Sequence, residues 1–199
     1  MSVTAATATS TAPPVPRRRR RAPGRGLILA LLLAAALAAG GAYAAVTLTR
    51  DSAPKLAVGV PEIVSPAEAA DAAKHVGHEV FGVGALPGTR LELTRGSRGE
   101  VWVRYLSGDA QAGDRRASFV TVGTYEQAGA YEAARDASEG ADSRSAELPG
   151  GGLMLWNLER PTSVYLARPG SDLLVEVYSP DAEQARSLAR AGAVVPLAG

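Results

Sequence analysis

The alternation of apolar and polar residues beyond residue 60 predicts a domain of mixed strands and helices. Apolar and polar positions alternate at residues 91–93 and 101–106, and the turn sequence GSRG at 96–99 separates the two segments. This pattern predicts a β-hairpin, because successive side chains of a strand point to opposite faces. Similar patterns predict further strands at residues 118–122, 146–148, 153–158, 164–167 and 173–178.

Three helices are predicted between these strands. Ser65 and Glu68 have the spacing of a capping box, and an alanine-rich stripe follows them to Val76. Thr124 and Gln127 repeat that spacing and predict a second helix to about residue 138, and Ser179-Pro180 predicts the start of a third. Short connections between neighbouring elements favour an α+β fold of about six mainly antiparallel strands and three helices.

The chain also contains a candidate internal repeat. The segments FVTVGT (119–124) and LVEVYS (174–179) align at an offset of 55 residues, which matches Thr124 with Ser179. Each half then consists of strands followed by a capped helix, which predicts two strand-then-helix repeats. The alternative is that strand-and-helix units of an alanine-rich chain align in this way without duplication.

A long uncharged stretch at residues 26–49 predicts a transmembrane helix, because about 20 apolar residues cross the hydrocarbon core of a bilayer. The positive-inside rule places the N-terminus in the cytoplasm. The residues that set this topology precede the stretch: Arg17, Arg18, Arg19, Arg20, Arg21 and Arg25. The predicted organisation is a disordered basic cytoplasmic tail (1–25), the transmembrane helix (26–49), a linker (50–61) and an extracytoplasmic domain (62–199).

The same stretch has a second interpretation as a signal peptide. Residues 27–39 have the length of a signal-peptide core, and Ala42-Tyr43-Ala44 has the small-x-small pattern of a cleavage site. Cleavage after Ala44 would give a secreted protein instead of a single-pass protein of the cell membrane. Both interpretations place the domain outside the cytoplasmic membrane.

Composition and charge narrow the function classes. Residues 1–50 carry seven positive charges, and residues 51–199 carry fourteen positive and twenty negative charges, a difference of −6. A mildly acidic domain argues against a nucleic-acid partner, which requires clustered basic residues. The chain has no cysteine, which excludes disulfides and thiolate chemistry. The lipid bilayer is the partner that the apolar stretch predicts.

The sequence shows no catalytic constellation. The two histidines, His75 and His78, lie three residues apart, without a third metal ligand at a useful spacing, so neither a metal nor a cofactor is predicted. An envelope hydrolase that uses His75 or His78 is the alternative. The absence of a nucleophile motif favours a non-enzymatic binding or interaction module.

The strand aromatics suggest where such a module would bind. Trp102 and Arg104 share one face of a predicted strand, and Glu176 lies on another strand. If helices cover only the other face of the sheet, these three residues form a candidate interaction face for an envelope protein or a glycan. The alternative is that both faces are covered and Trp102 belongs to the core.

Several blocks of the sequence resemble a known group of proteins. The blocks GEVWVRYL (99–106), FVTVGTY (119–125), LPGGGL (148–153), RPTSVYLARPGSD (160–172) and VEVYSP (175–180) resemble a family of actinobacterial single-pass membrane proteins of unknown function. That resemblance implies an envelope location and no site residues. Residues 65–105 also resemble, more weakly, the extracytoplasmic domains of anti-sigma factors and sporulation proteins, which implies a transmembrane signalling regulator as a further alternative.

Overall fold

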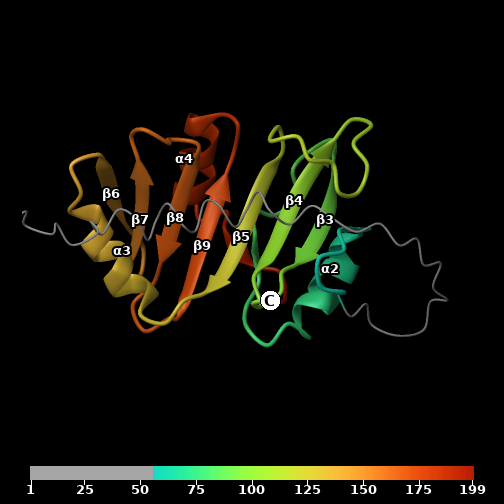
Figure 1. The fold of residues 1–199 in the computed structure, drawn as a ribbon, viewed down its shortest axis with the longest axis horizontal. Helices are drawn as coiled ribbons and strands as arrows, with labels where there is room; N and C mark the ends of the chain where they lie inside the picture. Colours follow the sequence, from blue (N-terminus) through green and yellow to red (C-terminus); the bar gives the residue numbers. More distant parts are fainter. Residues whose placement is uncertain (1–55) are drawn as a thin grey trace, which may run out of the picture.

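The computed structural model describes residues 56–199, which form one α+β domain (Figure 1). The predicted transmembrane segment 26–49, the basic tail with its arginines and the cleavage site at Ala44 lie outside the described residues. Within residues 56–199, no helix combines the length and the apolar character needed to span a bilayer.

A large antiparallel sheet forms the centre of the described domain. Its eight strands have the order β1-β3-β4-β5-β9-β8-β7-β6. Their bounds are β1 (Glu62–Val64), β3 (Thr89–Arg95), β4 (Val101–Ser107), β5 (Val120–Glu126), β6 (Ser143–Leu148), β7 (Gly152–Asn157), β8 (Ser163–Ala167) and β9 (Leu173–Tyr178). A second, two-stranded sheet pairs β10 (Val195–Pro196) with β2 (Phe81–Gly82).

Three helices in the described residues cover the two faces of the large sheet unequally. They are α2 (Pro66–Ala73), α3 (Ala130–Ser138) and α4 (Ala182–Arg190). Alanines of α2 and α4 pack in one cluster with the side chains that we call the aliphatic face: Leu93, Val101, Val103, Val122, Val164, Val175 and Val177. Alanines of α3 pack on the opposite face, which we call the groove face, over the half of the sheet that contains β6, β7 and β8 (Figure 1).

The first helix begins as the sequence predicts. The Ser65 hydroxyl accepts a hydrogen bond from the Glu68 amide at 3.2 Å, and the Glu68 carboxylate accepts one from the Ser65 amide at 2.8 Å. This reciprocal pair satisfies two amides that have no partner within the helix.

The α+β class, the antiparallel strands and the three helices are confirmed within the described residues.

The predicted start of the second helix is wrong. Thr124 is a fully buried residue of β5, and its hydroxyl accepts a hydrogen bond from the Phe81 amide at 3.1 Å. Helix α3 begins only at Ala130, after Gly129, which has a positive φ of 65°. The third helix is capped by Asp181 rather than by Ser179, since the Asp181 carboxylate accepts hydrogen bonds from the Glu183 and Gln184 amides.

The prediction of about six strands is too low, because the described residues contain strands of two or three residues that are too short to show alternation. The order of the large sheet is symmetrical about the boundary between β5 and β9, as a duplication would give. However, α3 follows β5 onto the groove face, whereas α4 follows β9 onto the aliphatic face. A simple repeat of strands followed by a helix would place both helices on the same face.

Candidate binding groove

The part of the groove face that α3 leaves uncovered carries two rows of side chains across five strands. The strand register aligns the first row as Thr94, Trp102, Gly123, Glu176 and Tyr165, and the second as Glu92, Arg104, Thr121, Tyr178 and Ser163. Neighbouring strands lie about 4.8 Å apart, so each row extends over roughly 19 Å. The five strands thus form a long, polar floor.

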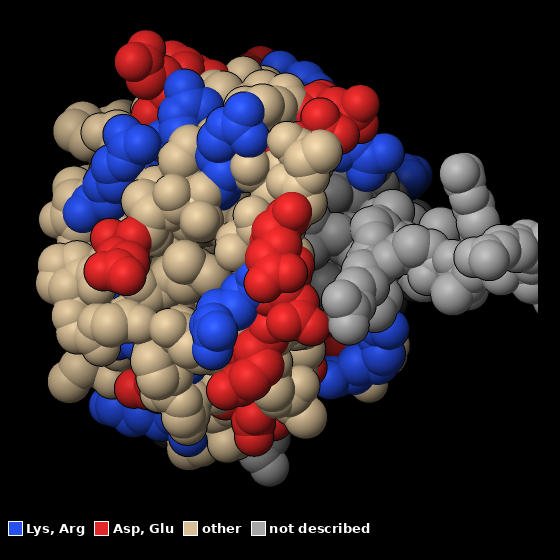
Figure 2. Space-filling model, turned by 90° about the vertical axis from the view of Figure 1, so that its left-hand side faces the viewer, with Lys and Arg blue, Asp and Glu red and all other residues tan. Residues whose placement is uncertain are grey.

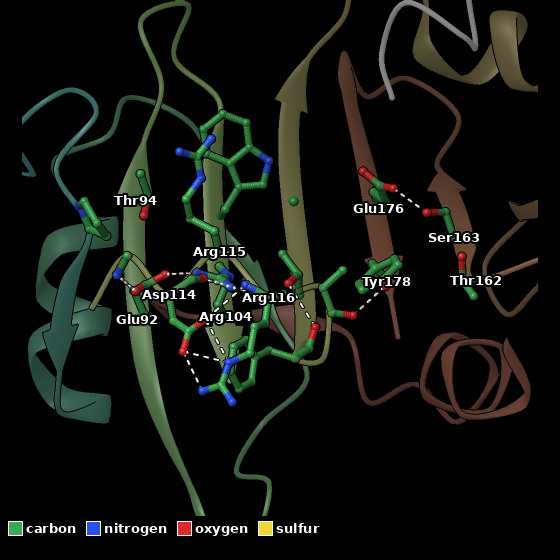
Figure 3. Close-up of a pocket in the computed structure, with 17 residues that line it drawn as sticks. Glu92, Thr94, Arg104, Asp114, Arg115, Arg116, Thr162, Ser163, Glu176 and Tyr178 are labelled. Carbon is green, nitrogen blue, oxygen red and sulfur yellow. Dashed lines mark hydrogen bonds and ion pairs between the residues drawn. The ribbon is translucent and has the colours of Figure 1, made fainter. Parts of the chain in front are cut away.

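A groove of about 530 Å³ lies over these rows. Pro61 and the connection between β4 and β5, including residues 113–117 and Phe119, line it together with Thr162 and Ser163. Figure 3 shows Asp114, Arg115 and Arg116 of that connection at one side of Glu176 and Thr162 and Ser163 at the other. Small-molecule and cofactor sites have volumes of about 300–1,000 Å³, so this groove has the size of a ligand site.

An ion pair at the floor holds the β4–β5 connection in place. The Arg104 guanidinium donates to Glu92 Oε1 at 2.7 Å and to the Asp114 carbonyl at 2.6 Å. The Glu92 carboxylate is fully buried and also accepts a hydrogen bond from the Gly113 amide. The Arg104 guanidinium also lies over the ring of Phe119, 5.3 Å from its centroid. These contacts fasten the groove wall to the sheet.

A second ion pair lies at the rim. The Arg116 guanidinium donates to both carboxylate oxygens of Asp114, at distances of 2.6–3.0 Å. These hydrogen bonds lower the pKa of Asp114 to about 2 and raise the pKa of Arg116. Asp114 and Arg116 therefore stay ionised and paired with each other across a wide pH range.

A network of hydroxyl groups surrounds Glu176. Its carboxylate accepts hydrogen bonds from Ser163 Oγ at 2.6 Å and from the Tyr125 hydroxyl at 2.8 Å. The Tyr125 hydroxyl accepts in turn from Trp102 Nε1 at 3.0 Å. Burial, followed by the nearby charge of Glu176, raises the pKa values of Tyr125 and Tyr165. Both phenols therefore remain protonated and available as donors.

Gly123 leaves the space that the Tyr125 ring occupies in this network. It lies between Trp102 and Glu176 in the first row, and a Cβ atom there would lie 2.7 Å from the Tyr125 hydroxyl. Real Cβ atoms do not approach so closely, so only glycine leaves room for the Tyr125 ring. The ring makes an edge-to-face contact with Trp102, with centroids 6.3 Å apart.

Two charged groups of the groove remain after these pairings. Glu176 is 7% exposed, and no described lysine, arginine or histidine forms an ion pair with it. Arg115 is exposed beside the groove, and no other described residue gives its guanidinium a hydrogen bond or an ion pair. The groove therefore offers an unmatched carboxylate at its floor and an unmatched cation at its rim.

The structure brings together the three residues of the candidate interaction face. Trp102, Arg104 and Glu176 all line the groove. Trp102 is only 7% exposed and packs in one cluster with Tyr125, so it presents no open aromatic platform. Sequence reasoning missed Glu92, which the register of the hairpin places opposite Arg104. It also missed Ser163 and Arg115, which no local pattern marks.

The histidines are not part of this groove. His75 is exposed just after α2. His78 borders a hollow of about 280 Å³ with Gly77 and Glu79. Its two ring nitrogens lie 2.8 Å from the Glu79 carbonyl and 2.9 Å from the Gly99 carbonyl. Both nitrogens thus face backbone carbonyl oxygens, and the described residues contain no group of three or more potential metal ligands.

Comparisons with known protein families, with curated proteins and with solved structures give no match for this chain. The groove and its chemistry are therefore the features of the described domain that bear on function.

Proposed function

We propose that this chain is a membrane-anchored extracytoplasmic protein whose α+β domain binds a ligand in the groove, without catalysing a reaction. The observation that carries the proposal is the groove itself. Its floor combines side chains from five strands, its volume is about 530 Å³, and it retains an unmatched carboxylate and an unmatched guanidinium. Convergent polar groups in a preformed hollow are typical of binding sites.

The location in the envelope is supported by the sequence of residues 1–50. An uncharged stretch of 24 residues follows six arginines, which is the arrangement of an N-in, single-pass anchor. The acidic balance of residues 51–199 suits a domain that faces outward, away from anionic nucleic acids.

Tryptophan fluorescence provides the test of binding. The chain has two tryptophans, and only Trp102 lines the groove, so a Trp156→Phe variant of the full chain reports on the groove alone. We expect a saturable change of Trp102 fluorescence when the variant, in nanodiscs of neutral lipid, is titrated with blocked peptides or with neutral oligosaccharides. A further Thr121→Phe substitution would fill the middle of the floor and should abolish that change.

Leu158→Phe is the matched control, because Leu158 is exposed and does not line the groove. Equal binding by the Thr121→Phe and Leu158→Phe variants would overturn the proposal, as would no saturable response to either ligand class. For the anchor, the intact mass of the chain from native membranes should include residues 26–49. A product that begins near Ala45 would instead establish the secreted form.

A further inference from the structure

We propose that the ligand of the groove is an extended peptide segment, with a lysine or arginine side chain that pairs with Glu176 and a carboxylate that pairs with Arg115. This inference depends on the proposed function, and it adds the chemical class of the ligand. It is carried by the two groups that the domain leaves without a partner of opposite charge.

Glu176 is the first of these groups. Its carboxylate is almost completely buried, and all its described polar partners are hydroxyl groups: Ser163, Tyr125 and Tyr165. Hydroxyl donors stabilise a carboxylate, but they do not neutralise it, and a buried charge is costly unless it is paired. Glu92, in the neighbouring row, is by contrast neutralised by an ion pair with Arg104. An ammonium or guanidinium group from a ligand would supply the missing charge.

The surroundings of Glu176 suit a long basic side chain. Tyr178 lines the groove near it and offers apolar ring surface. Lysine and arginine place their methylene stems along such surface while the charged head reaches a polar group.

Arg115 is the second unmatched group. The neighbouring Arg116 is engaged by Asp114, and Arg104 is engaged by Glu92, so Arg115 is the described arginine of the groove without a carboxylate. It lies on the wall formed by the β4–β5 connection, whereas Glu176 lies on β9 (Figure 3). A ligand that satisfies both groups therefore carries opposite charges at separate positions along its length.

The dimensions favour a peptide over a small amine. A floor of roughly 19 Å accommodates about six residues in extended conformation, at about 3.3 Å per residue. A neutral glycan is less well matched, because the buried edge-to-face position of Trp102 leaves no flat ring on which a sugar could stack.

The charge of the domain favours the approach of a basic ligand. Residues 51–199 carry six more negative than positive charges. At the end of the molecule where α3 and β6 lie, Glu132, Asp136 and Glu139 are exposed, and Figure 2 shows acidic side chains gathered there. Such a field raises the rate of encounter with cationic partners and weakens with salt.

The test measures peptide binding through Trp102 fluorescence of the full-length Trp156→Phe chain in nanodiscs of neutral lipid. The peptides are blocked hexapeptides of alanine and serine that contain one lysine and one glutamate, in both orders. Matched peptides replace the lysine by norleucine or the glutamate by glutamine. We expect norleucine to weaken binding by about 30-fold or more, since it leaves Glu176 unpaired. Glutamine should weaken binding by about two- to fivefold, as is usual for an exposed ion pair.

Protein variants give the complementary measurement. Glu176→Gln should remove the preference for lysine over norleucine, and Arg115→Gln should remove the preference for glutamate over glutamine. Arg186→Gln on α4, which does not line the groove, is the control and should preserve both preferences. If Glu176→Gln fails to fold, the comparison of lysine with norleucine on the Trp156→Phe chain still decides the question.

Three outcomes would overturn the inference, and they differ in what they mean for the proposed function. Equal affinity for the lysine and norleucine peptides, or saturable binding of a neutral oligosaccharide alone that Thr121→Phe abolishes, removes the peptide ligand but leaves a binding groove. No saturable response to any peptide or oligosaccharide removes both.

Discussion

The two faces of the large sheet are built from different chemistry. The aliphatic face consists of valine and leucine side chains under the alanines of α2 and α4, and its residues are almost fully buried. The groove face contains the buried carboxylates Glu92 and Glu176, and α3 covers only one part of it. The same strands thus carry an apolar core on one face and an incompletely covered polar surface on the other.

The difference indicates which face serves stability and which serves recognition. Burial of apolar surface stabilises a domain by about 25 cal/mol per Å², whereas burial of charged groups opposes folding unless they are paired. Among the described residues, no buried polar side-chain atom lacks a hydrogen-bond partner. The buried polar atoms of the groove face are therefore all hydrogen-bonded, but its unmatched charges add little stability, which is the pattern expected of a ligand site.

Leu93→Ala should produce the largest loss of stability. Leu93 is fully buried on the aliphatic face, and such truncations cost about 2–5 kcal/mol because a cavity remains. Urea unfolding of the full chain would measure the loss, and Leu158→Ala, at an exposed leucine, should cost less than about 0.5 kcal/mol. Similar losses at the two sites would contradict the assignment of the core to this face.

Arg104→Met should have the next largest effect, because it leaves Glu92 buried without a cation. Removal of one partner of a buried pair costs about 3 kcal/mol, whereas replacing both partners by apolar residues is often close to neutral. We therefore expect the Glu92→Leu/Arg104→Met double variant to regain most of the stability lost in Arg104→Met. Denaturant unfolding of both variants is the measurement, and a double variant less stable than the single one would refute this account.

Tyr125→Phe tests the hydroxyl network with a smaller change. The substitution removes the acceptor of Trp102 Nε1 and a donor to Glu176, which should cost about 1–3 kcal/mol. It should also shift the emission of Trp102 in the Trp156→Phe background. Tyr131→Phe on α3 is the control, since the Tyr131 hydroxyl forms no hydrogen bond with any other described residue, and stability and emission should stay unchanged there.

The two faces also differ in how far the sequence predicts them. Alternation alone identifies the aliphatic face, because Val101, Val103 and Val122 follow the period of a strand. The predicted start of α3 is wrong because Thr124 and Gln127 have the spacing of a capping box but do not form one. Thr124 is buried in β5, and its hydroxyl accepts a hydrogen bond from the Phe81 amide. That bond joins residues 43 positions apart, and local patterns contain no information about such contacts.

The groove depends even more on tertiary structure. The sequence places Trp102 and Arg104 on one strand face, but the alignment with Glu176 requires that β9 lies next to β5. Strand order is a non-local property, and the sequence pattern permits several orders. The burial of Trp102 depends on its contact with Tyr125, which lies 23 positions away, and no local pattern reveals such a contact.

Asp114 provides the smallest and most local test of the groove face. The folded-state pKa is about 2, below the usual 3.8, so ionised Asp114 stabilises the folded loop above pH 4. That contribution is lost as the pH falls through about 2. Carbon-detected NMR of the carboxyl groups should show the depressed midpoint, and Arg116→Gln should raise it toward 3.8. Asp71, whose pKa is lowered by Lys74, should be unaffected and serves as the internal control. An unchanged Asp114 midpoint in Arg116→Gln would show that the rim ion pair does not hold the groove wall.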